Sequence, residues 1–114
     1  MSRKRVVVTG MGMLSPVGNT IDETWSNLLA AKSGVANITH FDTEGFGTHF
    51  SASVKNFDLS HYLPPKEGKK MDLFIQYGMA AGIQAIQDAN LQVTDDNADR
   101  IGVAIGSGIG GLPL

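Results

Sequence analysis

Two short runs of aliphatic residues, one near each end of the chain, most constrain its fold. Residues 5–9 read RVVVT and residues 100–105 read RIGVAI, and each run leads directly into a glycine-rich stretch. Neither run alternates apolar and polar residues, which is typical of parallel strands buried on both faces. A helical pattern over residues 71–89 lies between them. This order predicts an α/β fold with a largely parallel sheet.

The segment after the first run predicts a helix over residues 21–32. Thr20 and Glu23 have the spacing of a capping box, in which each side chain accepts a hydrogen bond from the other residue's backbone amide. Gly34 is a natural helix stop. Residues 35–48 show no regular pattern, whereas residues 49–57 alternate weakly and predict an edge strand.

Four small residues lie on one face of the predicted helix over residues 71–89. Gly78, Gly82, Ala85 and Ala89 follow one another at spacings of four, three and four. An interior glycine costs about 1 kcal/mol relative to alanine in a helix. We therefore expect another backbone segment to approach this face closely.

Composition excludes several classes of protein. The 114 residues, with 42% hydrophobic residues, suit one small globular domain, and the net charge of −2 argues against a nucleic-acid partner. The absence of cysteine excludes a disulfide framework, a thiolate zinc site and a cysteine nucleophile within residues 1–114. His40, His49 and His61 lack metal-ligand spacing, no apolar run is long enough to insert into a membrane, and we expect no cofactor.

The glycine run near the C-terminus leaves a nucleotide-binding alternative open. Gly106, Gly108 and Gly111 match the spacing of a dinucleotide-binding loop, although no helix follows in this sequence. The turn over residues 10–15 is followed by a helix, but serine stands where the third glycine is expected. A small Rossmann-type module is thus one alternative reading.

A basic cluster precedes the long helix. If that helix extends backwards, Lys66, Lys69 and Lys70 lie on one of its faces. A solvated helix start explains the cluster most simply. However, three positive charges conflict with the dipole at a helix N-terminus, which favours a functional reason such as docking an acidic partner.

Taken together, four blocks of this sequence resemble the opening of a β-ketoacyl-[acyl-carrier-protein] synthase. They are RVVVTGMGMLSPVGNT, TWSNLLAAKSGV, KKMDLFIQYGMAAGIQAIQDA and RIGVAIGSGIGG. The resemblance covers residues 5–112, and Ile109 makes it similar to the synthase II type. It implies a thiolase-like fold, usually as a homodimer, of which residues 1–114 form an N-terminal portion. It also implies a cytoplasmic enzyme of fatty acid biosynthesis.

The implied reaction is a decarboxylative Claisen condensation between acyl and malonyl thioesters carried on acyl carrier protein. The family's catalytic cysteine and histidines match no residue of this sequence, so we expect the isolated chain to be inactive and partly unfolded. Lys66, Lys69 and Lys70 match the family's carrier-protein docking patch, and Ile109 matches a side chain that lines its acyl pocket. Pro113 stands where the family often has glycine. A non-catalytic homologue resembling a chain-length factor remains a second alternative.

Overall fold

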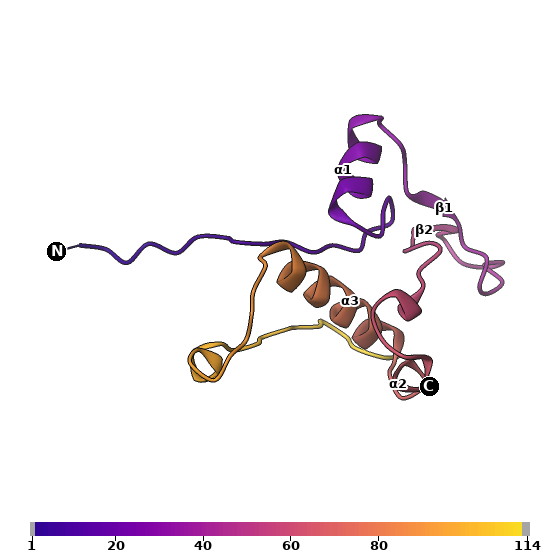
Figure 1. Ribbon diagram of the computed structural model, residues 1–114. Coiled ribbons are helices and arrows are strands. Elements are labelled where there is room, and N and C mark those ends of the chain that lie inside the picture. Colours follow the sequence, from indigo (N-terminus) through magenta and orange to yellow (C-terminus); the bar gives the residue numbers. More distant parts are fainter. Residues whose placement is uncertain (1, 113–114) are drawn as a thin grey trace. The chain divides into compact units, whose positions relative to one another are not determined.

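The computed structural model describes residues 2–112, so the unusual Pro113 lies outside the described residues. The chain divides into two compact units, residues 1–12 with 59–114, and residues 13–58. Figure 1 labels their elements, which are α1 (Ile21–Leu29), β1 (Val35–Asn37), β2 (Phe50–Ala52), α2 (Pro65–Gly68) and α3 (Leu73–Asp88). Single 3₁₀ turns at Leu59–His61 and Ala98–Arg100 complete them. None of the helices described is long and apolar enough to span a membrane.

In the unit of residues 13–58, the predicted cap of α1 is confirmed on one side only. The Thr20 hydroxyl accepts a hydrogen bond from the Glu23 backbone amide at 3.1 Å. The Glu23 carboxylate reaches one residue further back than a capping box requires and accepts from the Asn19 amide at 3.2 Å. The first bond satisfies one of the amide groups that lack an intrahelical partner at the start of the helix, and the second ties the helix to the residue before its cap.

Helix α1 ends at Leu29, earlier than the predicted end at residue 32. Ala31 takes a left-handed backbone with φ of 56°, the Ala31 amide donates to the Leu28 carbonyl at 3.0 Å, and the Lys32 amide donates to the Asn27 carbonyl at 2.9 Å. These two bonds form a Schellman motif, with alanine where glycine is usual. The prediction that Gly34 stops the helix is therefore wrong.

Strands β1 and β2 form a two-stranded antiparallel sheet, in which Val35 pairs with Ala52 and Asn37 pairs with Phe50. The predicted edge strand over residues 49–57 is thus confirmed over its first part. The prediction that residues 35–48 are irregular is wrong at β1, because strand pairing with β2 orders three residues that carry no period of their own.

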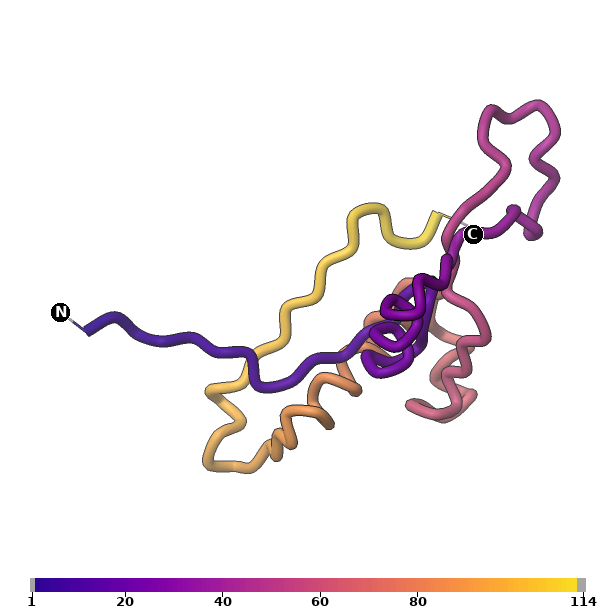
Figure 2. Tube along the Cα trace, turned by 90° about the horizontal axis from the view of Figure 1, so that it is seen from above, coloured from indigo at the N-terminus to yellow at the C-terminus, as the bar shows by residue number. Residues whose placement is uncertain are grey.

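In the other unit, the prediction of two buried parallel strands is wrong for the described residues. Residues 2–12 and 101–112 run as long, open traces in Figures 1 and 2, and no residue within 2–112 pairs with them as a strand. Val6 is 94% exposed and Val103 is 81% exposed. A strand is defined by hydrogen bonds to a neighbour, so apolar composition alone does not create one. The one sheet described is antiparallel.

Helix α3 confirms the strongest helical pattern in the sequence. It begins after Asp72 and ends in a second Schellman motif, in which Asn90 has φ of 50° and the Leu91 amide donates to the Ile86 carbonyl at 3.1 Å. Its Ala80 is fully buried.

The C-terminal half of α3 receives the close backbone approach that its small residues predict. A side-chain carbon placed on Gly10 would lie 2.5 Å from the Ala85 carbonyl oxygen and 2.7 Å from the Ala89 methyl carbon. The Met11 amide also donates to the Asp88 carboxylate at 2.9 Å. The expectation is confirmed at Ala85 and Ala89.

The N-terminal part of the small-residue face is more open. A side-chain carbon on Gly78 would meet only an Ile105 methyl group at 3.7 Å, and one on Gly82 would meet nothing within 4 Å. The glycines that allow the close approach are Gly10 and Gly12, which lie on the segment that crosses α3. The expectation of close approach is wrong at Gly82 among the described residues, because the Gly10–Gly12 backbone crosses the helix nearer its C-terminal end.

Candidate functional site

The three predicted docking lysines lie on one short helical segment, which we call the lysine turn (residues 65–70). Pro64 has an extended backbone, and Pro65 occupies the first position of the four-residue helix α2, which suits its fixed φ angle. Lys69 keeps helical angles, and the Lys70 amide donates to the Glu67 carbonyl at 3.2 Å. Lys66, Lys69 and Lys70 therefore share one helical stretch.

The long helix does not extend back through these lysines, so the condition for their sharing a face of α3 is not met. Asp72 has φ of −64° and ψ of 159°, an extended conformation that separates α2 from α3. The conflict between three lysines and the positive end of the long helix is thereby reduced, because Lys66 lies in the separate helix α2 and Lys69 and Lys70 lie in the turn that ends it.

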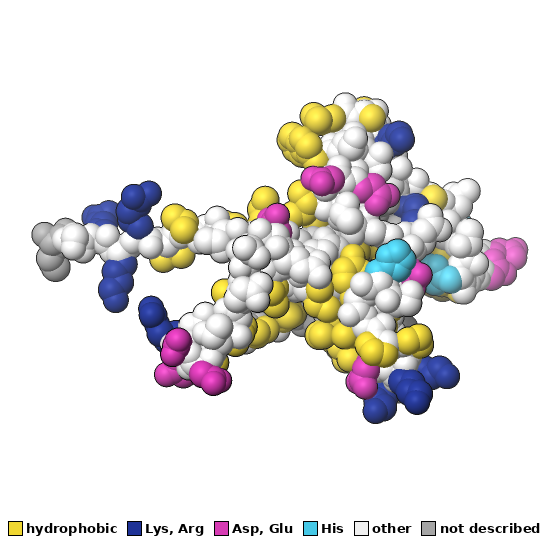
Figure 3. All heavy atoms as spheres, in the orientation of Figure 1, with side chains coloured by type: hydrophobic (Ala, Val, Ile, Leu, Met, Phe, Trp, Pro, Cys, Tyr) yellow, Lys and Arg dark blue, Asp and Glu magenta, His cyan; other side chains and the backbone are white. Residues whose placement is uncertain are grey.

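The lysine turn is exposed and positively charged. Lys66, Lys69 and Lys70 are all exposed, and none of their ammonium groups has an ion pair or hydrogen bond with any residue from 2 to 112. Glu67 is the single acidic residue in the turn, so three lysines and one glutamate give a charge of +2. Figure 3 shows the dark blue side chains gathered where Figure 1 labels α2. This arrangement suits a negatively charged partner surface.

Two side chains that the sequence reasoning missed hold the lysine turn. A side-chain carbon on Gly68 would overlap the Leu59 side chain, so Leu59 packs directly against the turn. From α3, the Gln76 side-chain amide donates to the carbonyl oxygens of Gly68 and Met71, at 3.3 and 3.1 Å. Nothing in the local sequence signals either contact, because each joins a side chain to the backbone of another element.

The predicted acyl-pocket residue, Ile109, is 77% exposed. It lies in residues 106–111, which we call the glycine loop. The Ser107 hydroxyl accepts a hydrogen bond from the Gly110 amide at 3.1 Å in this loop, and Gly110 has φ of 75°. A neighbouring cavity of about 420 Å³ is lined by Asp72, Leu73, Phe74, Tyr77, Gly110 and Gly111. Ile109 is absent from that lining, so its role in an acyl pocket stays a prediction.

The cavity beside the glycine loop is largely apolar in character. Burial raises the pKa of the Tyr77 phenol above its ordinary value, so this hydroxyl stays neutral at physiological pH. Gly111 lies against the Asp72 carboxylate and the Phe74 ring, with a placed side-chain carbon 3.0 Å from the Asp72 carboxyl carbon. The close approach explains why glycine suits this position.

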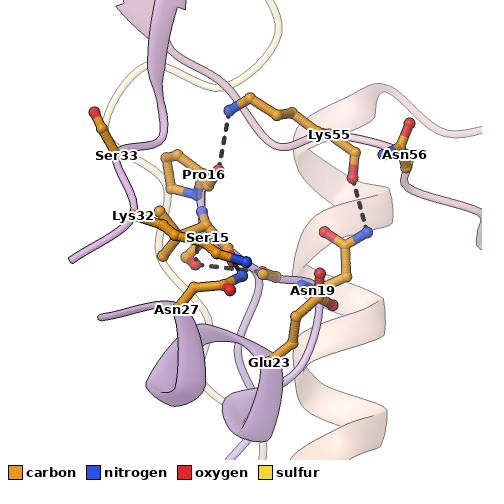
Figure 4. Close-up of a pocket in the computed structure, with 11 residues that line it drawn as sticks. Ser15, Pro16, Asn19, Glu23, Asn27, Lys32, Ser33, Lys55 and Asn56 are labelled. Atoms are coloured by element: carbon orange, nitrogen blue, oxygen red, sulfur yellow. Dashed lines mark hydrogen bonds between the residues drawn. The ribbon is translucent and has the colours of Figure 1, made fainter. Parts of the chain in front are cut away.

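A second polar site, in the unit of residues 13–58, is organised by Lys55. Its ammonium group donates to the carbonyl oxygens of Pro16, Gly34 and Ser53, at 2.9, 2.8 and 2.8 Å. Figure 4 shows Lys55 reaching Pro16, and the Asn19 side chain donating to the Lys55 carbonyl oxygen at 2.8 Å. All three ammonium hydrogens have acceptors, so this lysine ties loops together and is not free to bind an anion.

The histidines do not gather with carboxylates. Within residues 2–112, no group of three or more His, Asp or Glu side chains is placed to hold a metal ion. His49 instead contacts the Thr43 hydroxyl at 3.0 Å through Nδ1. The lysine turn and the glycine loop are therefore the two candidate functional features.

Comparison with known proteins identifies the family to which the chain belongs. Residues 3–112 match the family described as "Beta-ketoacyl synthase, N-terminal domain". The chain is 64% identical over 114 residues to 3-oxoacyl-[acyl-carrier-protein] synthase 2 of Vibrio cholerae, covering all of this chain and 28% of that protein. It is 49% identical over 109 residues to the synthase 2 of Staphylococcus aureus strain N315, covering 96% of this chain and 26% of that protein.

A solved structure agrees with these sequence matches and indicates the fold. The chain matches "The ishigamide ketosynthase/chain length factor" with a TM-score of 0.68 and 37% identity, covering 84% of this chain and 23% of that one. The thiolase-like α/β class is thus confirmed, and the Rossmann-type alternative is wrong. The chain spans about 28% of the length of the Vibrio relative. Because residues 3–112 match the N-terminal domain of the β-ketoacyl synthases, this chain belongs to the β-ketoacyl synthase family.

Proposed function

We propose that the whole protein is a 3-oxoacyl-[acyl-carrier-protein] synthase of fatty acid elongation, and that residues 1–114 are the N-terminal segment of its ketoacyl synthase domain. One observation carries this proposal, the 64% identity to the Vibrio cholerae synthase 2 across all 114 residues. The proposal includes a cytoplasmic homodimer, as the resemblance implies.

The proposed reaction has three chemical steps. A cysteine thiolate takes an acyl group from its carrier protein and releases the carrier's thiol. Malonyl carrier protein then loses carbon dioxide, and the resulting carbanion attacks the acyl thioester. The cysteine leaves, and the product is a 3-oxoacyl chain two carbons longer on the carrier. Because this sequence contains no cysteine, the proposal assigns the nucleophile to polypeptide outside residues 1–114.

The lysine turn is the part of this chain to which we assign a role in that reaction, the docking of acyl carrier protein. The three ammonium groups are exposed and make no bond within residues 2–112, so they are available to a partner's carboxylates. Each exposed charge pair contributes about 0.2–1 kcal/mol, and three together give useful affinity and faster association.

Charge reversal tests the docking role. In the full-length protein, replacing Lys66, Lys69 and Lys70 together with glutamate removes three attractions and adds three repulsions. We expect the KM for acyl carrier protein to rise about 10- to 100-fold at low salt, with little change in kcat.

A matched control changes the net charge equally at another exposed site. Replacing Arg3, Lys4 and Arg5 with glutamate should leave that KM within about twofold, because only the lysine turn is proposed to contact the carrier. Equal KM increases in both triple variants would reject the docking role in favour of a general effect of charge.

The chain-length-factor alternative is favoured by one specific observation, the similarity of this chain to a solved structure whose name includes both a ketosynthase and a chain length factor. Covalent acylation separates the two. A condensing enzyme incubated with a carrier protein that bears an acyl thioester gains the mass of one acyl group per active site. Alkylation of its cysteine prevents this gain. A full-length protein that never gains the acyl mass would support the chain-length-factor reading.

A further inference from the structure

We propose that Gln76 is a positioning residue for carrier-protein docking, which it serves by fixing the backbone of the lysine turn. This inference rests on the proposed function and goes beyond it, because Gln76 carries no charge and belongs to a different helix.

The Gln76 side chain bridges two elements. It projects from the first turns of α3, is half-buried, and donates from Nε2 to the carbonyl oxygens of Gly68 and Met71 at 3.3 and 3.1 Å. A primary amide has two N–H donors on this nitrogen, one for each carbonyl. Gly68 closes α2, and Met71 lies in the connection from α2 to α3. The two bonds thus bracket Lys69 and Lys70.

The lysine turn needs support from outside itself. Helix α2 has four residues, far fewer than an isolated helix requires for stability in water. Its neighbouring lysines repel one another at helical spacing, which further favours opening of the turn. The Leu59 side chain supports Gly68 from the 3₁₀ turn, and Gln76 supports it from α3.

A fixed turn presents its ammonium groups at a constant spacing. The carrier protein then meets a surface that is already ordered, and the entropy of ordering the turn is not lost on binding. Gln76 therefore affects the affinity for the carrier without altering the total charge that attracts it.

The test uses the full-length enzyme and the variant Gln76→Met, which keeps the length of the side chain and removes both donors. We expect KM for acyl carrier protein to rise about three- to tenfold, as two partly solvated hydrogen bonds are lost. We expect kcat to change by less than about twofold, and activity with carrier-free pantetheine thioesters to be unchanged. The dependence of carrier KM on salt should keep its slope, since no charge changes.

Gln84→Met is the matched control. Gln84 lies two turns later on α3, is also half-buried, and donates to the Tyr62 hydroxyl, outside the lysine turn, at 2.9 Å. Its carrier KM should stay within about twofold of the parent enzyme. Where Gln76→Met fails to fold, Gln76→Asn, which is polar but too short to reach both carbonyls, should raise carrier KM in the same direction.

The outcomes separate this inference from the docking proposal. If reversal of the three lysines leaves carrier KM unchanged, the docking role itself fails. If that reversal raises KM but Gln76→Met does not, only the positioning role is overturned. A KM increase for pantetheine thioesters equal to that for the carrier would also overturn it, because the damage would then lie in the active site.

Discussion

Residues 1–114, produced alone, should not unfold in a cooperative transition. The chain exposes 9540 Å² of surface. A compact monomer of 12.1 kDa exposes about 6000 Å² by the usual scaling of surface with mass, so roughly 3500 Å² that folding normally buries stays in water. At about 25 cal/mol per Å² for the apolar share, this forfeits tens of kcal/mol, against a typical net stability of 5–15 kcal/mol.

The exposed apolar residues show where the deficit lies. Ala80 is the one hydrophobic residue buried outright among residues 2–112. Trp25 is 60% exposed and Leu29 is 70% exposed on α1, and the valines near the N-terminus have no covering element among the described residues. Patches of this kind favour association or fluctuating structure over a single packed state.

Urea titration followed by far-UV circular dichroism tests this expectation. The isolated segment should lose helical signal gradually and bind a hydrophobic dye before any denaturant is added. The full-length protein, run in parallel, should show a steep transition. A sigmoidal curve for the isolated segment, with a slope of about 1 kcal/mol/M or more and no dye binding, would refute the reasoning.

Four further predictions are local or functional. In the full-length protein, Gly12→Ala should lower the free energy of unfolding by about 1–3 kcal/mol, because its new carbon would lie 2.7 Å from the Gln84 Cβ. Gly47→Ala places its carbon with nothing within 4 Å, so it should change that free energy by less than about 0.5 kcal/mol. Chemical denaturation measures both. Ala31→Gly should raise that free energy by about 0.5–1 kcal/mol, as glycine tolerates the φ of 56°, and an unchanged denaturation midpoint would contradict this. Ile109→Phe should shorten the longest acyl primer accepted while Ile109→Val should not, as read from product chain lengths; identical profiles would remove Ile109 from the pocket. The isolated segment should yield no 3-oxoacyl product by mass spectrometry, and detection of product would overturn its expected inactivity.

The helices could be predicted from sequence because their signals are local. Thr20 caps α1 through a residue three positions away, and Asn90 ends α3 through its own left-handed backbone. The strands could not be predicted as reliably, since pairing depends on distant segments. Residues 5–9 have strand-like composition without a strand partner among the described residues, while β1 forms where no period is visible.

In the candidate site too, local features could be predicted from the sequence and features that depend on other segments could not. The charge and spacing of Lys66, Lys69 and Lys70 are visible in the sequence, whereas their separation from α3 depends on the extended backbone of Asp72. The contribution of Gln76 was not visible, because a glutamine on an apolar helix gives no sign that two backbone carbonyls of another element lie within reach.

Product formation by the full-length protein tests the central claim most directly. The protein is incubated with acyl and malonyl carrier proteins, and the carrier-bound products are resolved by intact mass. The proposal predicts a 3-oxoacyl carrier protein two carbons longer than the primer, together with one carbon dioxide per turnover, and neither in the absence of enzyme. Turnover that yields only free carrier thiols, or no consumption of the malonyl carrier, would contradict the assignment as a condensing enzyme.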